Sequence, residues 1–247
     1  MLDAVRAARE ALATEHIIQP RQRGEREALR VLLTTRQGAV LASTAAINQL
    51  KALIVSAPED LRAELRRLKR PAQITRCSGL RARPAHDIEH RMTARALRST
   101  AQRIQALQTE AKELEGEILE LVRQRAPDLL DLLGVGPITV AQILVSWSHP
   151  ARFRSEAAFA AFAGVAPIPV SSGLTNRHRL NRSGDRQLNR ALYTIMMIRM
   201  RLDPTTKAYV ARRISEGKSS RDAQRCLKRA ICRQLFRTLE RRAPKSL

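Results

Sequence analysis

The stretch LRSTAQRIQALQTEAKELEGEILEL, Leu97–Leu121, decides the fold class of this chain. Its apolar residues recur at intervals of three and four, as on one stripe of a continuous helix. A seam of this period is typical of a coiled coil or an antiparallel helical hairpin, whose partner is either another helix of the chain or another subunit. The spacing predicts one helix from about Asp87 to Arg125, with a seam made of Leu97, Thr100, Ile104, Leu107, Ala111, Leu114, Ile118 and Leu121.

Helices are also predicted upstream of this seam. Leu2–Ala13 is alanine-rich with helical spacing, and a second long helix runs from about Glu25 to Val55. A shorter helix starts after Ser56, with Glu59 and Asp60 in its first turn, where the helix dipole favours acidic side chains. Cys77–His86, CSGLRARPAH, is predicted to be a loop. Apart from this loop, the front half of the chain is predicted to be helical and coiled.

Pro127 ends the coiled part, and the composition then changes. Leu129–Leu144, LLDLLGVGPITVAQIL, has the pattern of a helix-hairpin-helix, with a turn at Gly134 and Gly136 and with Ala141 at a close-packing position. In such hairpins the glycines let the backbone approach DNA, and N–H groups at the start of the second helix face a phosphate. The alternative is an ordinary helical turn that uses glycine as a C-cap.

Three more helices are expected downstream: a short one capped by Ser155, one within Asp185–Asp203, and a final one over Ser219–Arg242. The arginine and lysine face of the final helix is either a nucleic-acid face or a solvated one. No convincing β-alternation is present. The predicted fold class is therefore mostly α: long coiled-coil helices followed by a compact helical C-terminal domain with a helix-hairpin-helix-like motif.

The charge of the chain predicts its class of partner. There are 45 lysine and arginine residues against 23 aspartate and glutamate residues, a formal charge of +22 in 247 residues. Such an excess repels itself in the compact state, and a polyanion relieves that repulsion, so nucleic acid is the expected partner. Aromatic residues make up only 3% of the chain, which disfavours recognition of single strands mainly by base stacking.

Cysteine usage and hydropathy exclude other classes. The three cysteines show no CxxC spacing, so neither a disulfide framework nor a zinc knuckle is predicted. No apolar run is expected to reach the length that spans a bilayer, and no signal peptide is predicted. We expect a cytoplasmic, nucleoid-associated protein without a membrane partner.

One segment could carry chemistry: Pro169–Arg190, PVSSGLTNRHRLNRSGDRQLNR. Ser171 and Ser172 precede Gly173, which permits a tight, exposed turn. A serine hydroxyl attacks poorly unless a base takes its proton or neighbouring charge stabilises the alkoxide and the phosphorane. Composition alone favours the alternative that the serines cap a turn and the arginines only hold phosphates. The arginines that supply this charge are Arg177, Arg179, Arg182, Arg186 and Arg190.

The chain resembles a known family in several features of this segment and its surroundings. These features are the glycine turn after Leu133, the helix ending FAGVAP, the Ser-Gly pair and the run RLNRSGDRQLNRAL. The family is that of the insertion-sequence transposases of family one hundred and ten, which recombine DNA under the guidance of a bridge RNA. The similarity covers nearly the whole chain and is densest from Leu132 to Tyr193.

The resemblance implies two catalytic parts: an RNase H-like domain with four acidic residues that bind Mg²⁺, and a C-terminal helical domain whose serine forms a phosphoserine link to DNA. Ser172 matches that serine because it precedes the glycine, with the adjacent Ser171 as the fallback. Of the four acidic residues only Asp3 is matched, as an orphan remnant of the magnesium site. One carboxylate does not hold Mg²⁺ usefully, so none is expected to bind to this chain alone.

The expected organisation follows from the resemblance: a remnant of the RNase H-like domain at 1–20, a helical coiled-coil region at 21–126, a serine-containing domain at 127–240 and a tail at 241–247. We expect a DNA transposase that binds DNA and a structured guide RNA, forms homo-oligomers through the coiled coil, and is truncated and not autonomously active. The alternative is a non-catalytic DNA- or RNA-binding helical protein that pairs with a full-length transposase. Nucleic-acid contacts are assigned to Gly134, Gly136, Arg177, Arg179, Arg182, Arg186 and Arg190.

Overall fold

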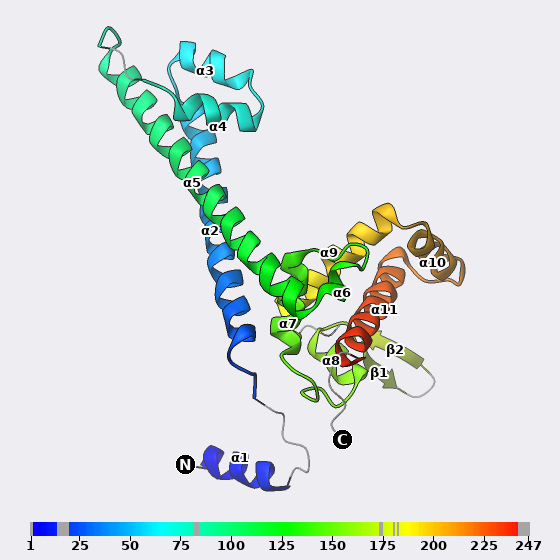
Figure 1. The fold of residues 1–247 in the computed structure, drawn as a ribbon. Helices are drawn as coiled ribbons and strands as arrows, with labels where there is room; N and C mark the ends of the chain where they lie inside the picture. The colour runs from blue at the N-terminus through cyan, green and yellow to red at the C-terminus, as the bar shows by residue number, and fades with distance from the viewer. Residues whose placement is uncertain are drawn as a thin grey trace. The chain divides into compact units, whose positions relative to one another are not determined.

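The computed structural model describes residues 2–13, 20–81, 84–172, 175–179, 181 and 183–241, with residues 171, 172 and 175–178 described by their backbone (Figure 1). These residues form eleven helices and one two-stranded sheet, which confirms the mostly α fold class. The chain divides into two compact units. Unit 1 comprises Met1–Arg30 and Glu120–Leu247, and unit 2 comprises Val31–Leu119.

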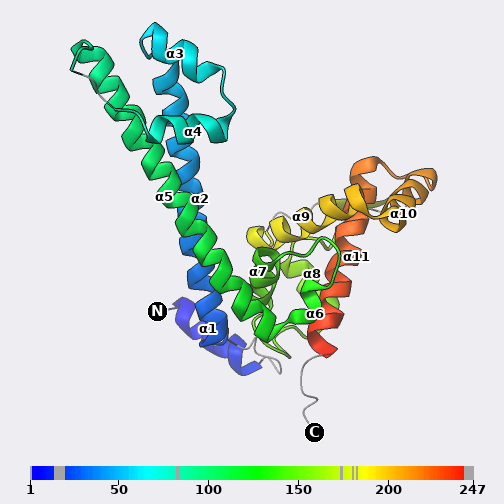
Figure 2. The same cartoon turned by 45° about the horizontal axis from the view of Figure 1, so that its top comes forward.

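Unit 2 is built on the antiparallel halves of two long helices, α2 (Glu25–Val55) and α5 (Ile88–Arg125), which lie side by side in Figures 1 and 2. Two short helices, α3 (Glu59–Arg66) and α4 (Arg70–Ser78), connect them. All four contribute to one core, and the predicted seam therefore has α2 as its partner within this unit. The core includes Leu50 and Ile54 of α2, Leu65 of α3, Cys77 of α4, and Leu97, Ala101 and Ile104 of α5.

The seam is closed at one end and open in its middle. Leu97, Thr100 and Ile104 are buried, as predicted. Leu107 and Ala111 are only half-buried, and they line a groove of about 300 Å³ together with residues of α2. Beside this groove an Arg36–Glu115 ion pair links the two helices at 2.7 Å.

Two predictions for this part of the chain need correction. Helix α4 begins at Arg70 and was not predicted; Pro71 stands in its first turn, where proline is tolerated, and Ile74 and Cys77 face the core. Helix α2 is long and apolar enough to cross a membrane, contrary to the expectation that no run reaches that length. One such helix is weak evidence for a membrane span, because core helices pass the same test. Helix α2 places Ala46, Leu50 and Ile54 in the core of unit 2.

The C-terminal part of unit 1 has α9 (Arg186–Leu202) at its centre, packed against α7 (Pro137–Trp147), α10 (Pro204–Ser215) and α11 (Ser220–Arg241). Two short helices, α6 (Pro127–Leu130) and α8 (Glu156–Phe162), complete it. Ser155 caps α8 as predicted, accepting a hydrogen bond from the Ala158 N–H at 3.2 Å. Helix α10 was not predicted as a separate element.

The core of this part contains the residues predicted to face inward on α9 and α11. Leu188, Leu192, Ile195 and Met196 of α9 are buried, and Met200 is half-buried. All four phenylalanines of the chain pack in one cluster, with ring centroids 5.1–5.4 Å apart. The buried residues of α11 include Ala223, Leu227, Ile231, Leu235 and Leu239.

The segment before α2 is anchored to the C-terminal end of α7. The Gln22 N–H donates to Ser148 Oγ at 3.0 Å, and Arg26 Nε donates to the Val145 carbonyl at 3.2 Å. Arg152 donates to the next carbonyl of the helix. Two guanidinium groups at this end match the negative pole of the helix dipole, although burial lowers the pKa of both. Helix α1 (Leu2–Ala13) precedes this segment.

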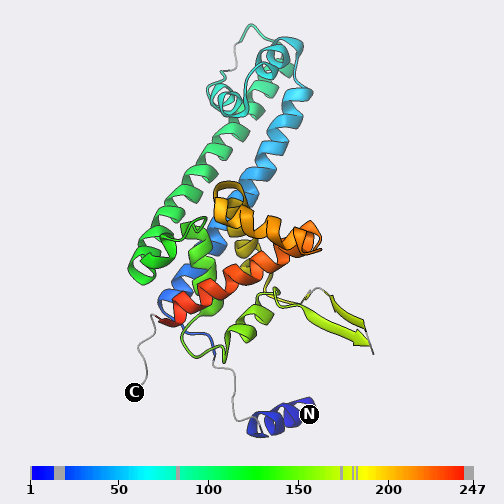
Figure 3. The ribbon, with the colours of Figure 1, turned by 90° about the vertical axis from the view of Figure 1, so that its right-hand side faces the viewer.

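A β-hairpin interrupts the helices, contrary to the prediction that no strands form. Its strands are β1 (Ile168–Ser172) and β2 (Thr175–Arg179), which pair antiparallel (Figure 3). Val170 is 47% exposed, so burial of an apolar face is not what stabilises β1. A strand is recognised in a sequence by alternating apolar and polar residues. This short hairpin is held by backbone pairing and shows no convincing alternation, so the sequence did not predict it.

Candidate nucleic-acid interface

Ser171 and Ser172 end strand β1. In the ladder Ser172 opposes Thr175, and Gly173 and Leu174 between them lie outside the described residues. Residues that oppose each other, and residues two apart on a strand, belong to one face of an antiparallel ladder. The register therefore groups Ser172 with Arg177 and Arg179, whereas Ser171 belongs to the other set.

The base of the hairpin is fixed where Gly164 and Gly184 cross. Gly164 follows α8 with φ at +67°, a conformation that favours glycine. A Cβ built on Gly184 would lie 2.4 Å from Gly164 N and 2.5 Å from Gly164 Cα. Both neighbours are backbone atoms that cannot rotate away, so the contact requires glycine at position 184.

Hydrogen bonds around this crossing satisfy the carbonyls at the end of α8. Asn181 Nδ2 donates to the Ala161 carbonyl at 2.9 Å. Asn189 Nδ2 donates to the Ala163 carbonyl at 2.8 Å, and the Asp185 N–H donates to the carbonyl between them at 2.7 Å. The last carbonyls of a helix lack intrahelical donors, so these groups bind the hairpin base to α8.

Asp185 joins the same base to two further helices. Its carboxylate caps α9 by accepting from the backbone N–H groups of Gln187 and Leu188 at 2.9 and 3.0 Å. It also accepts from Ser146 Oγ of α7 at 3.0 Å. An acidic N-cap is favoured both by the free N–H groups and by the helix dipole. The hairpin therefore projects from a base fixed to α7, α8 and α9.

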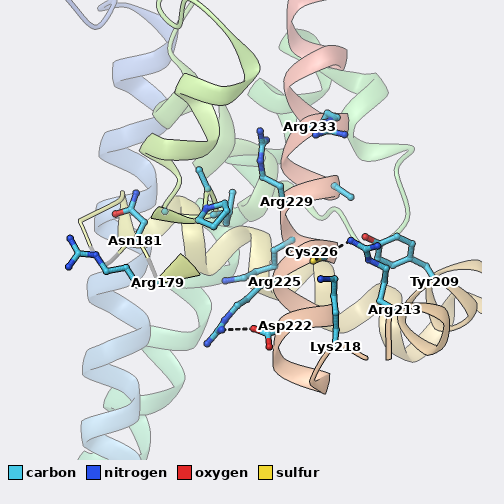
Figure 4. Close-up of a pocket in the computed structure, with 16 residues that line it drawn as sticks. Arg179, Asn181, Tyr209, Arg213, Lys218, Asp222, Arg225, Cys226, Arg229 and Arg233 are labelled. Carbon is cyan, nitrogen blue, oxygen red and sulfur yellow. Dashed lines mark hydrogen bonds and ion pairs between the residues drawn. The ribbon is translucent and has the colours of Figure 1, made fainter. Parts of the chain in front are cut away.

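A pocket of about 610 Å³ lies beside this base, between the segment 164–167, Asn181, α10 and α11 (Figure 4). We name it the α10–α11 pocket. Val165, Ala166 and Pro167 form an apolar part of its wall, and the half-buried Tyr209 of α10 contributes an aromatic ring. One acidic side chain, Asp222, lines it against the cations Arg179, Arg213, Lys218, Arg225, Lys228, Arg229 and Arg233.

Acidic partners hold several of these cations in place. Arg229 forms a two-point ion pair with Glu156 of α8, with one contact at 2.9 Å. Arg213 pairs with Glu216 at 2.7 Å, and Arg225 pairs with Asp222 at 2.7 Å. Bidentate and charge-assisted contacts give the guanidinium groups fixed directions. These ion pairs therefore orient Arg213, Arg225 and Arg229 within the wall.

Lys228 is a half-buried lysine of this wall. Its Nζ donates to Asn189 Oδ1 at 3.0 Å, so it is linked through Asn189 to the base of the hairpin. Burial lowers the pKa of Lys228, and the nearby Arg225 lowers it further. A cation that is short of water and lies close to another cation gains most from an anion placed beside it.

The predicted arginines separate into distinct places. Arg179 is exposed and lines the α10–α11 pocket, whereas Arg186 and Arg190 are exposed on α9. Arg177 is described only by its backbone in β2, and Arg182 lies outside the described residues. Sequence analysis assigned no nucleic-acid contact to the cations of α10 and α11. The basic face of the final helix is the signal for those of α11, whereas no sequence pattern indicates Arg213 of α10.

The predicted helix-hairpin-helix is altered by the structure. Its first helix is the single turn α6, and Gly134 at φ +81° packs against α9, where a Cβ would lie 3.2 Å from the Ile195 carbonyl. Gly134 is thus required for internal packing. Gly136 has open space around it and donates its N–H to Thr139 Oγ1 at 2.9 Å at the start of α7. A phosphate contact at Gly136 stays a prediction.

The described residues do not fit a magnesium site around Asp3. Asp3 is exposed in the first turn of α1. Across the parts of the chain that the structure describes, no three histidine, cysteine or acidic side chains gather in a way that could hold a metal ion. Two histidines, His86 and His90, have their ring centroids 3.9 Å apart, and His90 Nε2 bonds to Asp60 at 2.9 Å.

Comparisons with known proteins match the part of the chain that contains the hairpin and its base. Residues 126–211 match the family model of the transposase IS116/IS110/IS902 family. The chain is 32% identical over 144 residues to the insertion element IS110 uncharacterized 43.6 kDa protein of Streptomyces coelicolor, an alignment that covers 57% of this chain and 36% of that protein. It is also 32% identical over 142 residues to the insertion element IS900 uncharacterized 42 kDa protein of Mycobacterium paratuberculosis, with 56% and 36% covered.

The matched part thus amounts to about a third of the length of these relatives. The range 126–211 that matches the family model contains the hairpin with Ser171 and Ser172, the Gly164–Gly184 crossing and all of α7, α8 and α9. Residues 126–211 of this chain therefore match the transposase IS116/IS110/IS902 family.

Proposed function

We propose that the chain acts on DNA as an insertion-sequence transposase and that Ser172 is its nucleophile. The observation that supports this most is the register of the hairpin, which groups Ser172 with Arg177 and Arg179. Arg179 in turn lines the basic α10–α11 pocket. A serine that shares its ladder face with two arginine positions, on a hairpin with a fixed base, is suited to attack on a phosphodiester.

The proposed step is a direct displacement at phosphorus. Ser172 Oγ forms a bond to the phosphorus while the bond from phosphorus to one bridging oxygen breaks. The hydroxyl proton passes to solvent or to a neighbouring base, and the released DNA oxygen takes up a proton. Arginine side chains stabilise the charge that develops on the phosphoryl oxygens. The product is a phosphoserine link that conserves the energy of the phosphodiester for rejoining.

The partners follow from the same proposal. The formal charge of +22 supports binding of DNA, and the resemblance adds a structured guide RNA. The half-open groove beside Leu107 and Ala111 supports contact with a second copy along the α2–α5 seam. Mg²⁺ belongs to the proposal only for the complete recombination centre of the family, because the described residues do not form such a site.

Covalent trapping tests the proposal. The chain is incubated with nicked DNA substrates of an insertion-element end, and adducts are separated on a denaturing gel. The wild type and Ser171→Ala should give an adduct that Ser172→Ala abolishes, while DNA affinity measured by fluorescence anisotropy stays within about twofold. An adduct that survives in Ser172→Ala would reject the assignment. Strong binding without any adduct would favour the non-catalytic nucleic-acid-binding alternative.

A further inference from the structure

The serine step draws on Arg179 at the edge of the α10–α11 pocket, but nothing in that step uses the cations of α10 and α11. We propose that this pocket binds one unpaired nucleotide of a nucleic-acid strand, with its phosphates against the cationic wall and its base beside Tyr209. The inference deepens the proposed function and rests on it for the class of polymer. It does not depend on the identity of the nucleophile.

Charge is the first argument. Seven cationic side chains line the pocket against one acidic side chain. Even when Glu156 and Glu216, the acidic partners of Arg229 and Arg213, are counted with Asp222, four positive charges remain in excess. A concave wall with this excess concentrates the positive potential, so it attracts phosphate more strongly than a flat basic surface.

Shape and chemistry distinguish an unpaired nucleotide from a duplex. A concave site of about 610 Å³ has the size that encloses a small ligand, whereas the rigid convex backbone of a duplex cannot enter it. The wall also offers what a base needs: the Tyr209 ring, and the apolar surface of Val165, Ala166 and Pro167 on the segment 164–167. Base stacking on a single aromatic ring tolerates any sequence.

The tyrosine is held in position by cations. The guanidinium carbons of Arg212 and Arg213 lie 5.5 and 6.0 Å from the centroid of the Tyr209 ring. Arg213 also lies 3.8 Å from the Cys226 sulfur, inside the pocket (Figure 4). A nucleotide on Tyr209 therefore brings its phosphate close to Arg213, with Lys218 and Lys228 as further cations of the same wall.

The pocket is also linked to the hairpin. Lys228 bonds to Asn189, which bonds to the Ala163 carbonyl beside the Gly164–Gly184 crossing. Asn181 belongs both to the pocket lining and to the hydrogen bonds of the hairpin base. A nucleotide in the pocket would consequently fix the strand next to the segment that carries Ser172.

Cys226 provides a direct probe of occupancy. It lines the pocket and is half-buried, whereas Cys77 and Cys232 are fully buried. Burial raises the pKa of Cys77 to about 11 and that of Cys232 to about 12, so both stay protonated and shielded at pH 8. A thiol reagent such as Ellman's reagent should therefore report on Cys226 alone in the folded protein.

The experiment compares labelling rates with three probes at equal concentration: a 12-nucleotide single-stranded DNA, the same sequence as RNA, and the blunt DNA duplex. Anisotropy on the same samples gives the fraction bound. At equal occupancy we expect either single strand to slow Cys226 labelling at least fivefold and the duplex to slow it less than twofold. The DNA and RNA arms show which strand the pocket prefers.

Substitutions test whether binding and the protection of Cys226 depend on side chains of the pocket wall. Tyr209→Leu should weaken single-strand binding roughly fivefold or more, as loss of a stacked base predicts, and Tyr209→Phe should restore it. Lys218→Gln should reduce the salt slope of binding by about 0.7. Lys207→Gln, which removes an exposed α10 lysine outside the pocket lining, is the matched control and should leave protection unchanged.

The outcomes separate the two proposals. Single strands that bind fully but leave Cys226 labelling unchanged would overturn the pocket and leave the DNA-binding function standing. Equal protection by the duplex would overturn the unpaired-nucleotide assignment. If neither strand nor duplex binds at low salt, the proposed function itself fails.

Discussion

Replacing Gly184 with alanine should destabilise unit 1 by about 2–4 kcal/mol. The new Cβ would meet Gly164 N at 2.4 Å, Gly164 Cα at 2.5 Å and the Ala163 carbonyl carbon at 3.0 Å. Carbon atoms pack best at about 3.5–4.0 Å, so the backbones must separate by roughly 1 Å. Overpacking of this kind typically costs about 1–3 kcal/mol, and each neighbouring hydrogen bond that the shift stretches adds about 1 kcal/mol.

The hydrogen bonds at risk are those of Asp185 N–H and Asn181 to the end of α8, at 2.7 and 2.9 Å. For a unit of this size a loss of about 2–4 kcal/mol lowers Tm by roughly 5–15 °C. Thermal unfolding followed by circular dichroism measures this change in Tm. Gly116→Ala in α5 is the control, because nothing lies within 4 Å of its Cβ and alanine favours a helix by up to about 1 kcal/mol. A Gly184→Ala melt within 1–2 °C of the wild type, at roughly 1 kcal/mol or less, would refute the crossing.

Two further substitutions test the packing of unit 1. Arg26→Met leaves the buried Val145 carbonyl without its donor and should lower the free energy of unfolding by about 2 kcal/mol in urea titrations; an unchanged midpoint would contradict the anchor of the segment before α2. Lys228→Gln keeps a donor for Asn189 and removes a cation whose pKa burial lowers, so Tm should stay or rise while single-strand affinity falls. Because the folded-state pKa of Lys228 lies below the unfolded one, wild-type stability should rise between those two pKa values as the pH increases, and the variant should lack that rise.

Long periodic elements were predictable from the sequence because their pattern repeats over many turns. The 3.5-residue spacing in Leu97–Leu121 predicted α5, and the bounds expected for α2 match the structure. The β-hairpin was not predictable from alternation, since Ile168–Ser172 is a proline-containing strand with an exposed Val170. Its base lies at the Gly164–Gly184 contact, which joins residues twenty positions apart in the sequence.

The candidate site was only half predictable for a related reason. The arginines that follow Ser172 are visible in the sequence, and one of them, Arg179, lines the pocket. The pocket wall combines residues of α10 and α11 with the segment 164–167. These parts are far apart in the sequence, so no local sequence pattern predicts that they form one pocket. At Gly134 the structure adds a packing role that the sequence did not indicate, the close approach of α9, and a contact of this glycine with DNA stays a prediction.

Identification of the residue that carries DNA after covalent trapping tests the central claim most directly. The trapped adduct is digested with nuclease and protease, and the nucleotide-bearing peptide is located by mass spectrometry. We predict a single modified peptide with the phosphate on Ser172. Attachment at any other side chain, Ser171 included, would contradict the assignment of Ser172 as the nucleophile.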